Sequence, residues 1–365
     1  MATEPSDRLN ALLLDRNAVA IVCRQPLESV EGPGGVVFPP TYAGKGDNAP
    51  PEYNISDFGD GRNVCTMDSV QSQANRIEAA FLTAPYRALV REVTVRAELA
   101  DGEQRIIDVL EAPHRLADAT IRFSDLRQDA ERAFRNFRDA PRAVAELSPM
   151  SLLMGAFDSR GTYCKIPRAL TARIEAHNVR RLVRRALYSA ALTGKDLGHE
   201  DSKLSQIGLD NALDGPIPGG IIADGGIWRE AVLNLIALRQ NCGQRVTNRY
   251  DEKPSKTPPD DLSAYIFGLG LVSLTLQPET FLRQGCLLVA AAPVAATIRY
   301  ADGAKTSFSL STVDALEFAK TAALRFGVAS LPPRQGHFQR ELIDEANRQA
   351  QEKNEKKKVK GNRGA

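Results

Sequence analysis

Hydrophobic positions at helical spacing indicate where this chain forms helices. A stripe of apolar residues every three or four positions predicts an amphipathic helix over residues 68–82. Asp68 or Thr66 is the expected N-cap of this helix. The pattern also predicts helices over residues 126–138, 228–240 and 312–326.

Strands are predicted where apolar residues alternate with polar ones or form short runs. Residues 170–177 alternate along their whole length, and residues 18–23 form an apolar run typical of a buried strand. The other expected strands are residues 89–99, 106–110, 152–157, 264–276, 286–291 and 296–300. Turns are expected at residues 101–102, 158–161 and 301–303. Residues 179–187 fit a helix and an extended ribbon equally well.

Segments rich in Gly, Pro and Asp interrupt this pattern. Residues 26–62 and 193–226 are predicted to be long insertions, and residues 252–261 to form a further exposed loop. The mixed order of helices and strands predicts an α+β fold rather than a regular doubly wound sheet. We expect one domain over residues 1–330, followed by a charged, flexible C-terminal tail over residues 331–365.

The amino-acid composition and net charge limit which classes of protein fit this sequence. Of the 365 residues, 43% are hydrophobic, which is enough for a substantial core. The net charge is only +2, from 47 basic and 45 acidic residues, so any affinity for nucleic acid depends on where the charges lie. The polar N-terminus does not resemble a signal peptide, and no stretch reaches the length of a membrane span. We therefore expect a reduced, cytoplasmic protein.

Motifs that carry catalysis are missing from the sequence. The five cysteines are scattered and the four histidines isolated, which argues against a metal site or a redox pair. A phosphate loop and a nucleophile elbow are also missing. His114 fits a general acid–base, an RNA contact, or a polar residue at the start of a helix. The sequence thus predicts a protein that is not an enzyme and that uses neither metal nor cofactor.

Positive charge is concentrated between Lys165 and Arg185. This stretch holds seven basic residues and one acidic residue, Glu175, for a local net charge of +6 in a chain that totals +2. The basic residues are Lys165, Arg168, Arg173, Arg180, Arg181, Arg184 and Arg185. Arginine binds phosphate oxygens well, because its guanidinium donates two parallel hydrogen bonds. The same charge would also fit a solvated helix face.

The helix predicted at residues 68–82 offers a second polar surface. The residues expected on its exposed face are Ser69, Ser72, Gln73 and Arg76. Donors at the N-terminus of a helix favour phosphate, because unpaired amides and the helix dipole add their effects there. The alternative is an ordinary amphipathic helix with a solvated face.

Five segments, in order along the chain, resemble a known family. They are Asp68 to Glu78, Pro113 to Ala119, Ser148 to Ser159, Lys165 to Leu170, and Phe281 to Leu288. Together they resemble the backbone subunit of type I-G (formerly I-U) CRISPR Cascade complexes, a family of the RAMP superfamily. Each segment is weak evidence alone, and the ordered set is specific.

The resemblance implies a ferredoxin-like or RRM-like core sheet with helices on one side and long loop or hairpin insertions. Several head-to-tail copies of such a subunit coat the spacer of a CRISPR RNA, and a protruding thumb bends the RNA. Its bases then pair with a target DNA strand, which a separate helicase-nuclease cuts. Further partners are other Cascade subunits. Both predicted insertions are candidates for the thumb, and residues 193–226 are favoured.

The resemblance and the charge pattern together give a set of candidate RNA contacts. They are Ser69, Ser72, Gln73, Asn75, Arg76, His114, Arg115, Lys165, Arg168, Arg173, Arg181, Arg184 and Arg185. Lys165 and Arg168 lie in a family-like segment, whereas residues 180–185 are supported by charge alone. Two alternatives stay open: an RNA-processing endoribonuclease of the same superfamily with His114 as base, and an unrelated cytosolic metabolic enzyme.

Overall fold

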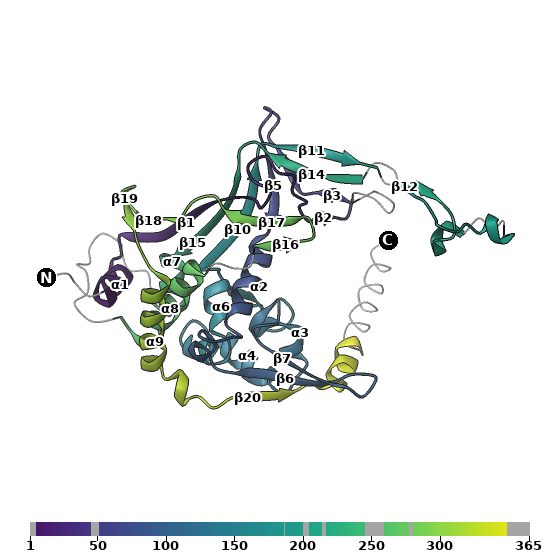
Figure 1. The fold of residues 1–365 in the computed structure, drawn as a ribbon. Helices are drawn as coiled ribbons and strands as arrows, with labels where there is room; N and C mark the ends of the chain where they lie inside the picture. The colour runs from purple at the N-terminus through teal and green to yellow at the C-terminus, as the bar shows by residue number, and fades with distance from the viewer. Residues whose placement is uncertain are drawn as a thin grey trace, which may run out of the picture.

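A computed structural model describes residues 5–44, 51–185, 187–199, 204–213, 217–244, 259–276 and 280–348. The chain has a mixed α+β fold, in which a curled antiparallel sheet is covered by helices on one side (Figure 1). Most of the predicted loop 252–261 and the Lys-rich end of the predicted tail lie outside the described residues. In the described part of the chain, no helix is both long and apolar enough to cross a membrane.

The main sheet brings together strands from both halves of the chain. In spatial order they are β16 (Phe281–Arg283), β17 (Cys286–Ala290), β1 (Ala18–Ser29), β15 (Ile227–Asn234), β10 (Leu170–His177), β5 (Asn63–Asp68) and β4 (Ile55–Asp57). β18 (Ala295–Tyr300) also pairs with β1, and β19 (Lys305–Phe308) pairs with β18. All these neighbours are antiparallel. The predicted strands at residues 18–23, 170–177, 286–291 and 296–300 are confirmed.

Alternation along the strands gives the sheet two different faces. On β10 the buried side chains are Leu170, Ala172, Ile174 and Ala176. The opposite face carries a row of charges, because Arg24 on β1, Glu230 on β15 and Arg173 on β10 are in register. Glu230 forms ion pairs with both neighbours, at 3.2 Å to Arg24 and 3.1 Å to Arg173. The charges in this row of the open face are therefore paired with one another.

The helices lie on the side of the sheet's apolar face, and some of them pack directly against it. They are α1 (Pro5–Leu14), α2 (Val70–Ala80), α3 (Ala119–Arg122), α4 (Arg127–Arg135), α5 (Arg142–Leu147), α6 (Pro149–Met154), α7 (Leu235–Asn241), α8 (Asp261–Thr275) and α9 (Thr312–Phe326). Of these, α2, α6, α7 and α8 contact the strands β1, β10 or β15, and α9 packs on α8. The helices predicted at residues 68–82, 126–138 and 312–326 are confirmed. Ser69, rather than Asp68 or Thr66, caps α2.

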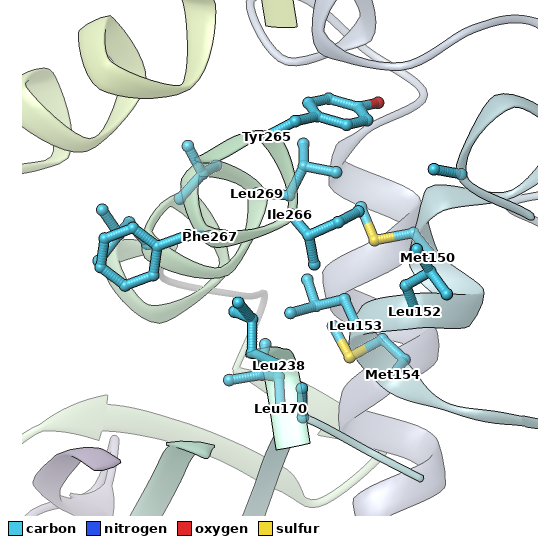
Figure 2. Close-up of a cluster of buried hydrophobic side chains, with 14 of the residues drawn as sticks. Met150, Leu152, Leu153, Met154, Leu170, Leu238, Tyr265, Ile266, Phe267 and Leu269 are labelled. Atoms are coloured by element: carbon cyan, nitrogen blue, oxygen red, sulfur yellow. The ribbon is translucent and has the colours of Figure 1, made fainter. Parts of the chain in front are cut away.

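Helix α8 is at the centre of the core, as Figure 2 shows for the side chains around Tyr265, Ile266 and Phe267. Residues 262–274 are all buried, and the ring of Tyr265 stacks on Phe326 of α9 with centroids 4.5 Å apart. The strand predicted at residues 264–276 is therefore wrong. A continuous apolar run fits a buried helix as well as a buried strand, and the N-cap, Asp260, fixes the helical start by accepting from the amide of Ser263.

Two further predictions need correction. Residues 152–157 were expected to be a strand, but residues 149–154 form α6, which has Pro149 at its first turn and ends at Gly155. The predicted helix at residues 228–240 is instead strand β15 followed by α7. Asn234 sets the boundary, because its side chain accepts hydrogen bonds from the amides of Ile236 and Ala237.

A smaller sheet lies on the far side of the helices from the main sheet (Figure 1). The hairpin of β6 (Val93–Glu98) and β7 (Gln104–Asp108) matches the strands and turn predicted there. β20 (Arg334–His337) adds to β6 in parallel, so the chain stays in a sheet beyond residue 331. Residues 341–348 are helical.

An antiparallel hairpin projects from one end of the main sheet (Figure 1). It consists of β11 (Val179–Arg184) and β14 (Ile217–Ala223), and continues outward with β12 (Leu187–Tyr188) and β13 (Ala212–Leu213). We call this hairpin, residues 179–223, the arm. Within the ambiguous segment 179–187, residues 179–184 are thus an extended strand, and residue 187 begins β12. The arm includes most of the predicted insertion at residues 193–226 but begins before it.

The predicted insertion at residues 26–62 is less irregular than expected. β1 extends through it to Ser29, and short strands β2 (Thr41–Tyr42) and β3 (Glu52–Tyr53) pair with each other. β4 then pairs with β5 at the edge of the main sheet. Among the described residues of this segment, short strands therefore alternate with turns and irregular stretches.

Candidate nucleic-acid interface

A cleft of about 850 Å³ opens beside the N-terminal half of α2. Its walls are α2, residues 113–122, residues 155–160 and residues 165–168. The lining side chains that carry positive charge or an imidazole are His114, Arg115, Arg122, Arg160, Lys165 and Arg168. Among the described residues that line this cleft there is no Asp or Glu. A cleft lined by one sign of charge concentrates ions of the opposite sign, so this one favours anions. We call it the basic cleft.

A short hairpin forms one wall of the basic cleft. Its strands are β8 (Ala156–Phe157) and β9 (Lys165–Ile166), with Phe157 paired to Lys165. The turn between them is held by Asp158, whose carboxylate accepts from the amides of Gly161 at 2.9 Å and Thr162 at 2.6 Å. This confirms the predicted turn at residues 158–161. Lys165 is exposed on this hairpin, where its ammonium is available to a ligand.

Gln71 joins two walls of the basic cleft. Its side-chain oxygen accepts from the guanidinium of Arg168 at 2.8 Å, and its side-chain nitrogen donates to the carbonyl of Pro113 at 3.0 Å. Partial burial lowers the pKa of Arg168, and the nearby Arg115 cation lowers it further. An arginine nevertheless stays charged at neutral pH. Gln71 therefore holds a cationic group in a fixed place at the cleft.

Arg115 lines the cleft but is only 3% exposed. Its guanidinium donates to both carboxylate oxygens of Glu78 at 2.7 Å and to the carbonyl of Gly155 at 3.1 Å. Burial raises the pKa of Glu78, and Arg115 offsets part of this effect. We therefore remove Arg115 from the predicted RNA contacts, because it is buried and already makes three hydrogen bonds inside the protein.

The start of α2 is only partly the surface that the sequence predicted. Ser69 accepts from the amide of Ser72 at 3.2 Å, as a helix N-cap does. Gln73, expected on the exposed face, is fully buried. It donates to Asp68 at 2.6 Å and accepts from Arg229 at 3.0 Å. Gln73 is therefore also removed, because it faces the sheet and not solvent.

Arg76 and Asn75 have different surroundings. Arg76 pairs with Asp68 at 3.2 Å and donates to the carbonyl of Leu282 at 3.1 Å. This contact brings two of the family-like segments together, residues 68–78 and 281–288. Asn75 is exposed and accepts from Gln71 at 2.9 Å. Arg76 thus links α2 to β16 at the edge of the main sheet, whereas Asn75 lies close to the basic cleft. His114 is exposed at the cleft itself.

Strand β10 divides the basic cluster of residues 165–185 into two groups. Lys165 and Arg168 precede the strand and lie at the cleft, whereas residues 180–185 follow it and belong to the arm. At about 3.3 Å per residue, the strand separates the groups by roughly 20–25 Å. Arg173, in the middle, lies on the open face and pairs with Glu175 at 2.9 Å as well as with Glu230. The sequence cluster is therefore not one surface.

Arginines of the arm differ in what they contact. Arg180 makes two hydrogen bonds to Asp224, at 2.7 and 2.9 Å. Arg184 lies 5.5 Å from the ring centre of Phe38, and Arg181, Arg184 and Arg185 are all exposed. These three guanidinium groups are positioned to meet a partner from solvent.

The base of the arm is held by side chains of β5, in the main sheet, and of β3. The Asn63 side chain accepts from the amide of Val179 at 2.7 Å and donates to its carbonyl at 3.0 Å. The amide of Gly220 donates to the hydroxyl of Tyr53 at 2.8 Å, and burial raises the pKa of that hydroxyl. Both strands of the arm, β11 and β14, are thus held by hydrogen bonds to side chains outside the arm.

Sequence reasoning missed four residues of the basic cleft: Gln71, Arg122, Phe157 and Arg160. Two of them, Gln71 and Phe157, lie inside the family-like segments, and Arg160 directly follows one of these segments. Arg122 lies just beyond one of these segments, and its position on α3 brings it to the cleft. The signal that could have found them was the clustering of these segments around one site.

Part of this chain matches the model of a protein family. Residues 21–181 match the family model described as CRISPR-associated protein GSU0053. The match supports a CRISPR-associated protein. It covers every lining residue of the basic cleft, from Gln71 to Arg168, and ends within the first strand of the arm. No curated protein matches this chain.

Proposed function

We propose that this protein is a non-catalytic backbone subunit of a type I-G CRISPR interference complex. It binds the spacer of the CRISPR RNA along the sugar–phosphate backbone, assembles in several copies along it and presents bases to target DNA. The observation that carries this proposal is the basic cleft, because its cations and the lack of carboxylates among its described lining residues suit a polyanion. The matched CRISPR-associated family covers the same residues.

The strand order supports a ferredoxin-like, RAMP-type core within this proposal. Strands β18, β1, β15 and β10 are neighbours in that order, with each pair antiparallel. The connection from β1 to β10 contains α2 and α6, and the connection from β15 to β18 contains α7 and α8. Two such split β-α-β units, interleaved in one sheet, are the arrangement of the ferredoxin-like fold.

The arm is the best candidate for the thumb. It projects from the sheet, is fixed at its base by Asn63 and Tyr53, and presents exposed arginines. An element of this kind reaches beyond its own subunit and can contact RNA or the next copy. In this proposal the partners are the CRISPR RNA, further copies of the chain, other Cascade subunits and a helicase-nuclease, all in the cytoplasm.

Co-purification tests the proposal. The protein is expressed with and without a CRISPR array of its own type, and the purified material is analysed for RNA and for mass by light scattering. We expect RNA of a defined length to co-purify, with a mass corresponding to several copies per RNA. A monomeric, RNA-free product in both cases, together with no binding of added RNA at low salt, contradicts the proposal.

One observation favours a second candidate function. His114 is exposed at the cleft, which Arg122 and Lys165 also line. An imidazole close to cations that hold a phosphate can act as general base or acid in RNA cleavage. Incubation with repeat-containing precursor RNA separates the two functions. A backbone subunit leaves the RNA intact, whereas an endoribonuclease produces specific fragments that disappear in His114→Ala.

A further inference from the structure

Two aromatic rings of the β8–β9 hairpin are exposed. Phe157 is 52% exposed and lines the basic cleft, and Tyr163, in the turn of the same hairpin, is 73% exposed. Aromatic side chains are few in this chain, at 6% of residues. The ring of Phe157 contributes little to the core, and at the cleft it is free to contact a ligand.

The hairpin that carries these rings is rigid. Asp158 is 6% exposed, and its carboxylate accepts hydrogen bonds from two amides and from the hydroxyl of Thr162 at 2.9 Å. Backbone hydrogen bonds join Asp158 to Cys164 at 3.0 Å and to Tyr163 at 2.8 Å. Ile166, at the end of β9, is buried in the core. The ring of Phe157 is therefore presented on a fixed support, which reduces the entropy lost on binding.

Charge and aromatic surface lie together on this hairpin. Phe157 pairs across the two strands with Lys165, and Arg160 in the turn also lines the cleft. Cations that follow a phosphate backbone, combined with rings on which bases stack, are typical of sites for single-stranded nucleic acid. In a duplex the base faces are covered by neighbouring bases, so a ring of this kind has nothing to stack on.

We propose that Phe157 stacks on an unpaired base of the RNA whose phosphates occupy the basic cleft. The site then prefers single-stranded nucleic acid to a continuous duplex in which every base is stacked. The inference rests on the proposed function, because it assumes RNA in this cleft, and it adds a contact to the base where that function needs only contacts to the backbone. Gln71 and Asp158 are positioning residues for it, since they hold Arg168 and the hairpin.

The test measures binding of labelled oligouridine, of the same RNA with abasic sugars, and of a duplex, by fluorescence anisotropy with the full chain. Wild-type protein is compared with Phe157→Leu, which keeps apolar bulk, and Phe157→Trp, which keeps a ring. Phe58→Leu is the matched control, because Phe58 is similarly exposed at 59% but lies in the turn between β4 and β5.

We expect Phe157→Leu to weaken binding of oligouridine at least about fivefold, and Phe157→Trp and Phe58→Leu to bind like wild type. Abasic RNA should bind wild type and Phe157→Leu equally. If Phe157→Leu loses the same factor on both RNAs, or if the duplex binds as tightly as the single strand, the inference is wrong while the proposed function stands. If wild type binds none of the RNAs at low salt, both are wrong.

Discussion

Arg115 and Glu78 form a buried pair in which the guanidinium donates to both carboxylate oxygens at 2.7 Å. Their side chains are 3% and 1% exposed. The pair joins α2 to residues 113–117, and Arg115 also donates to the carbonyl of Gly155 at the start of the β8–β9 hairpin. It thus fixes three walls of the basic cleft relative to one another.

Removing one member of this pair should destabilise the fold. Glu78→Ala leaves the charge of Arg115 buried without its partner, which typically costs about 3–5 kcal/mol. The free energy of unfolding in urea measures this. Glu317→Ala is the control, since Glu317 and Lys320 form an exposed pair whose loss costs about 0–1 kcal/mol. Equal stability of the two variants would mean that the buried pair contributes nothing.

Gly155 connects α6 to β8, and a side chain there should disturb the cleft. Its φ is +81°, and a Cβ atom would lie 2.7 Å from the Arg168 side chain and 3.0 Å from the carbonyl of Ile166. We expect Gly155→Ala to lower stability by roughly 2–5 kcal/mol, from backbone strain and overpacking together, and to weaken RNA binding.

Gly102→Ala separates these two effects. Gly102 also has positive φ, at +86°, but a Cβ atom there meets nothing within 4 Å. We expect it to lose only about 1–2 kcal/mol in the same unfolding measurement and to bind RNA normally. If both variants behave alike, the close approach of Gly155 to Arg168 has no role in shaping the cleft.

Salt dependence distinguishes cations that bind phosphate from cations that are already paired. Lys165→Gln should reduce the slope of log affinity against log salt by about one unit, since one phosphate contact is lost. Arg173→Gln should leave the slope unchanged, because Glu175 and Glu230 neutralise Arg173 on the open face. Titrations of oligouridine at several salt concentrations measure both. An equal reduction of the slope in both variants would mean that the RNA also contacts Arg173 on the open face of the sheet.

The arm can be tested in the same way. A triple variant in which Arg181, Arg184 and Arg185 are all replaced by Gln should bind RNA of every sequence more weakly. Its slope of log affinity against log salt should also be smaller than that of wild type. Arg180→Gln is the control, because Arg180 is held by two hydrogen bonds to Asp224. An unchanged slope in the triple variant would show that the arm faces solvent or a protein neighbour rather than RNA.

Regular patterns explain which elements the sequence could predict. The helix at residues 312–326 and the strand at residues 170–177 have the predicted bounds, because each has one buried and one exposed face that its period reveals. Residues 264–276 lack such a contrast, since α8 is buried on all sides, and the period then gives no information. In that segment, packing against the rest of the folded chain determines the structure, and the local pattern does not.

Residues of the candidate site could be predicted from the sequence only where a local concentration of charge was enough to identify them. The candidate RNA contacts Lys165 and Arg168 lie at the basic cleft, whereas Arg115 pairs with Glu78, which is 37 positions away in the chain. Gln73 was placed on the wrong face for a similar reason, because Asp68 and Arg229 bury it. Phe157 carries no charge and was found only through its position in the folded chain.

Crosslinking locates the RNA most directly. Guide RNA labelled with 4-thiouridine is bound to the full chain and irradiated, and the crosslinked peptides are identified by mass spectrometry. RNA bound in the basic cleft should crosslink within residues 155–168 and 113–122, around Phe157, and the crosslink at the position of that ring should be lost in Phe157→Leu. Crosslinks confined to the open face, at β1, β15 and the middle of β10, would contradict it.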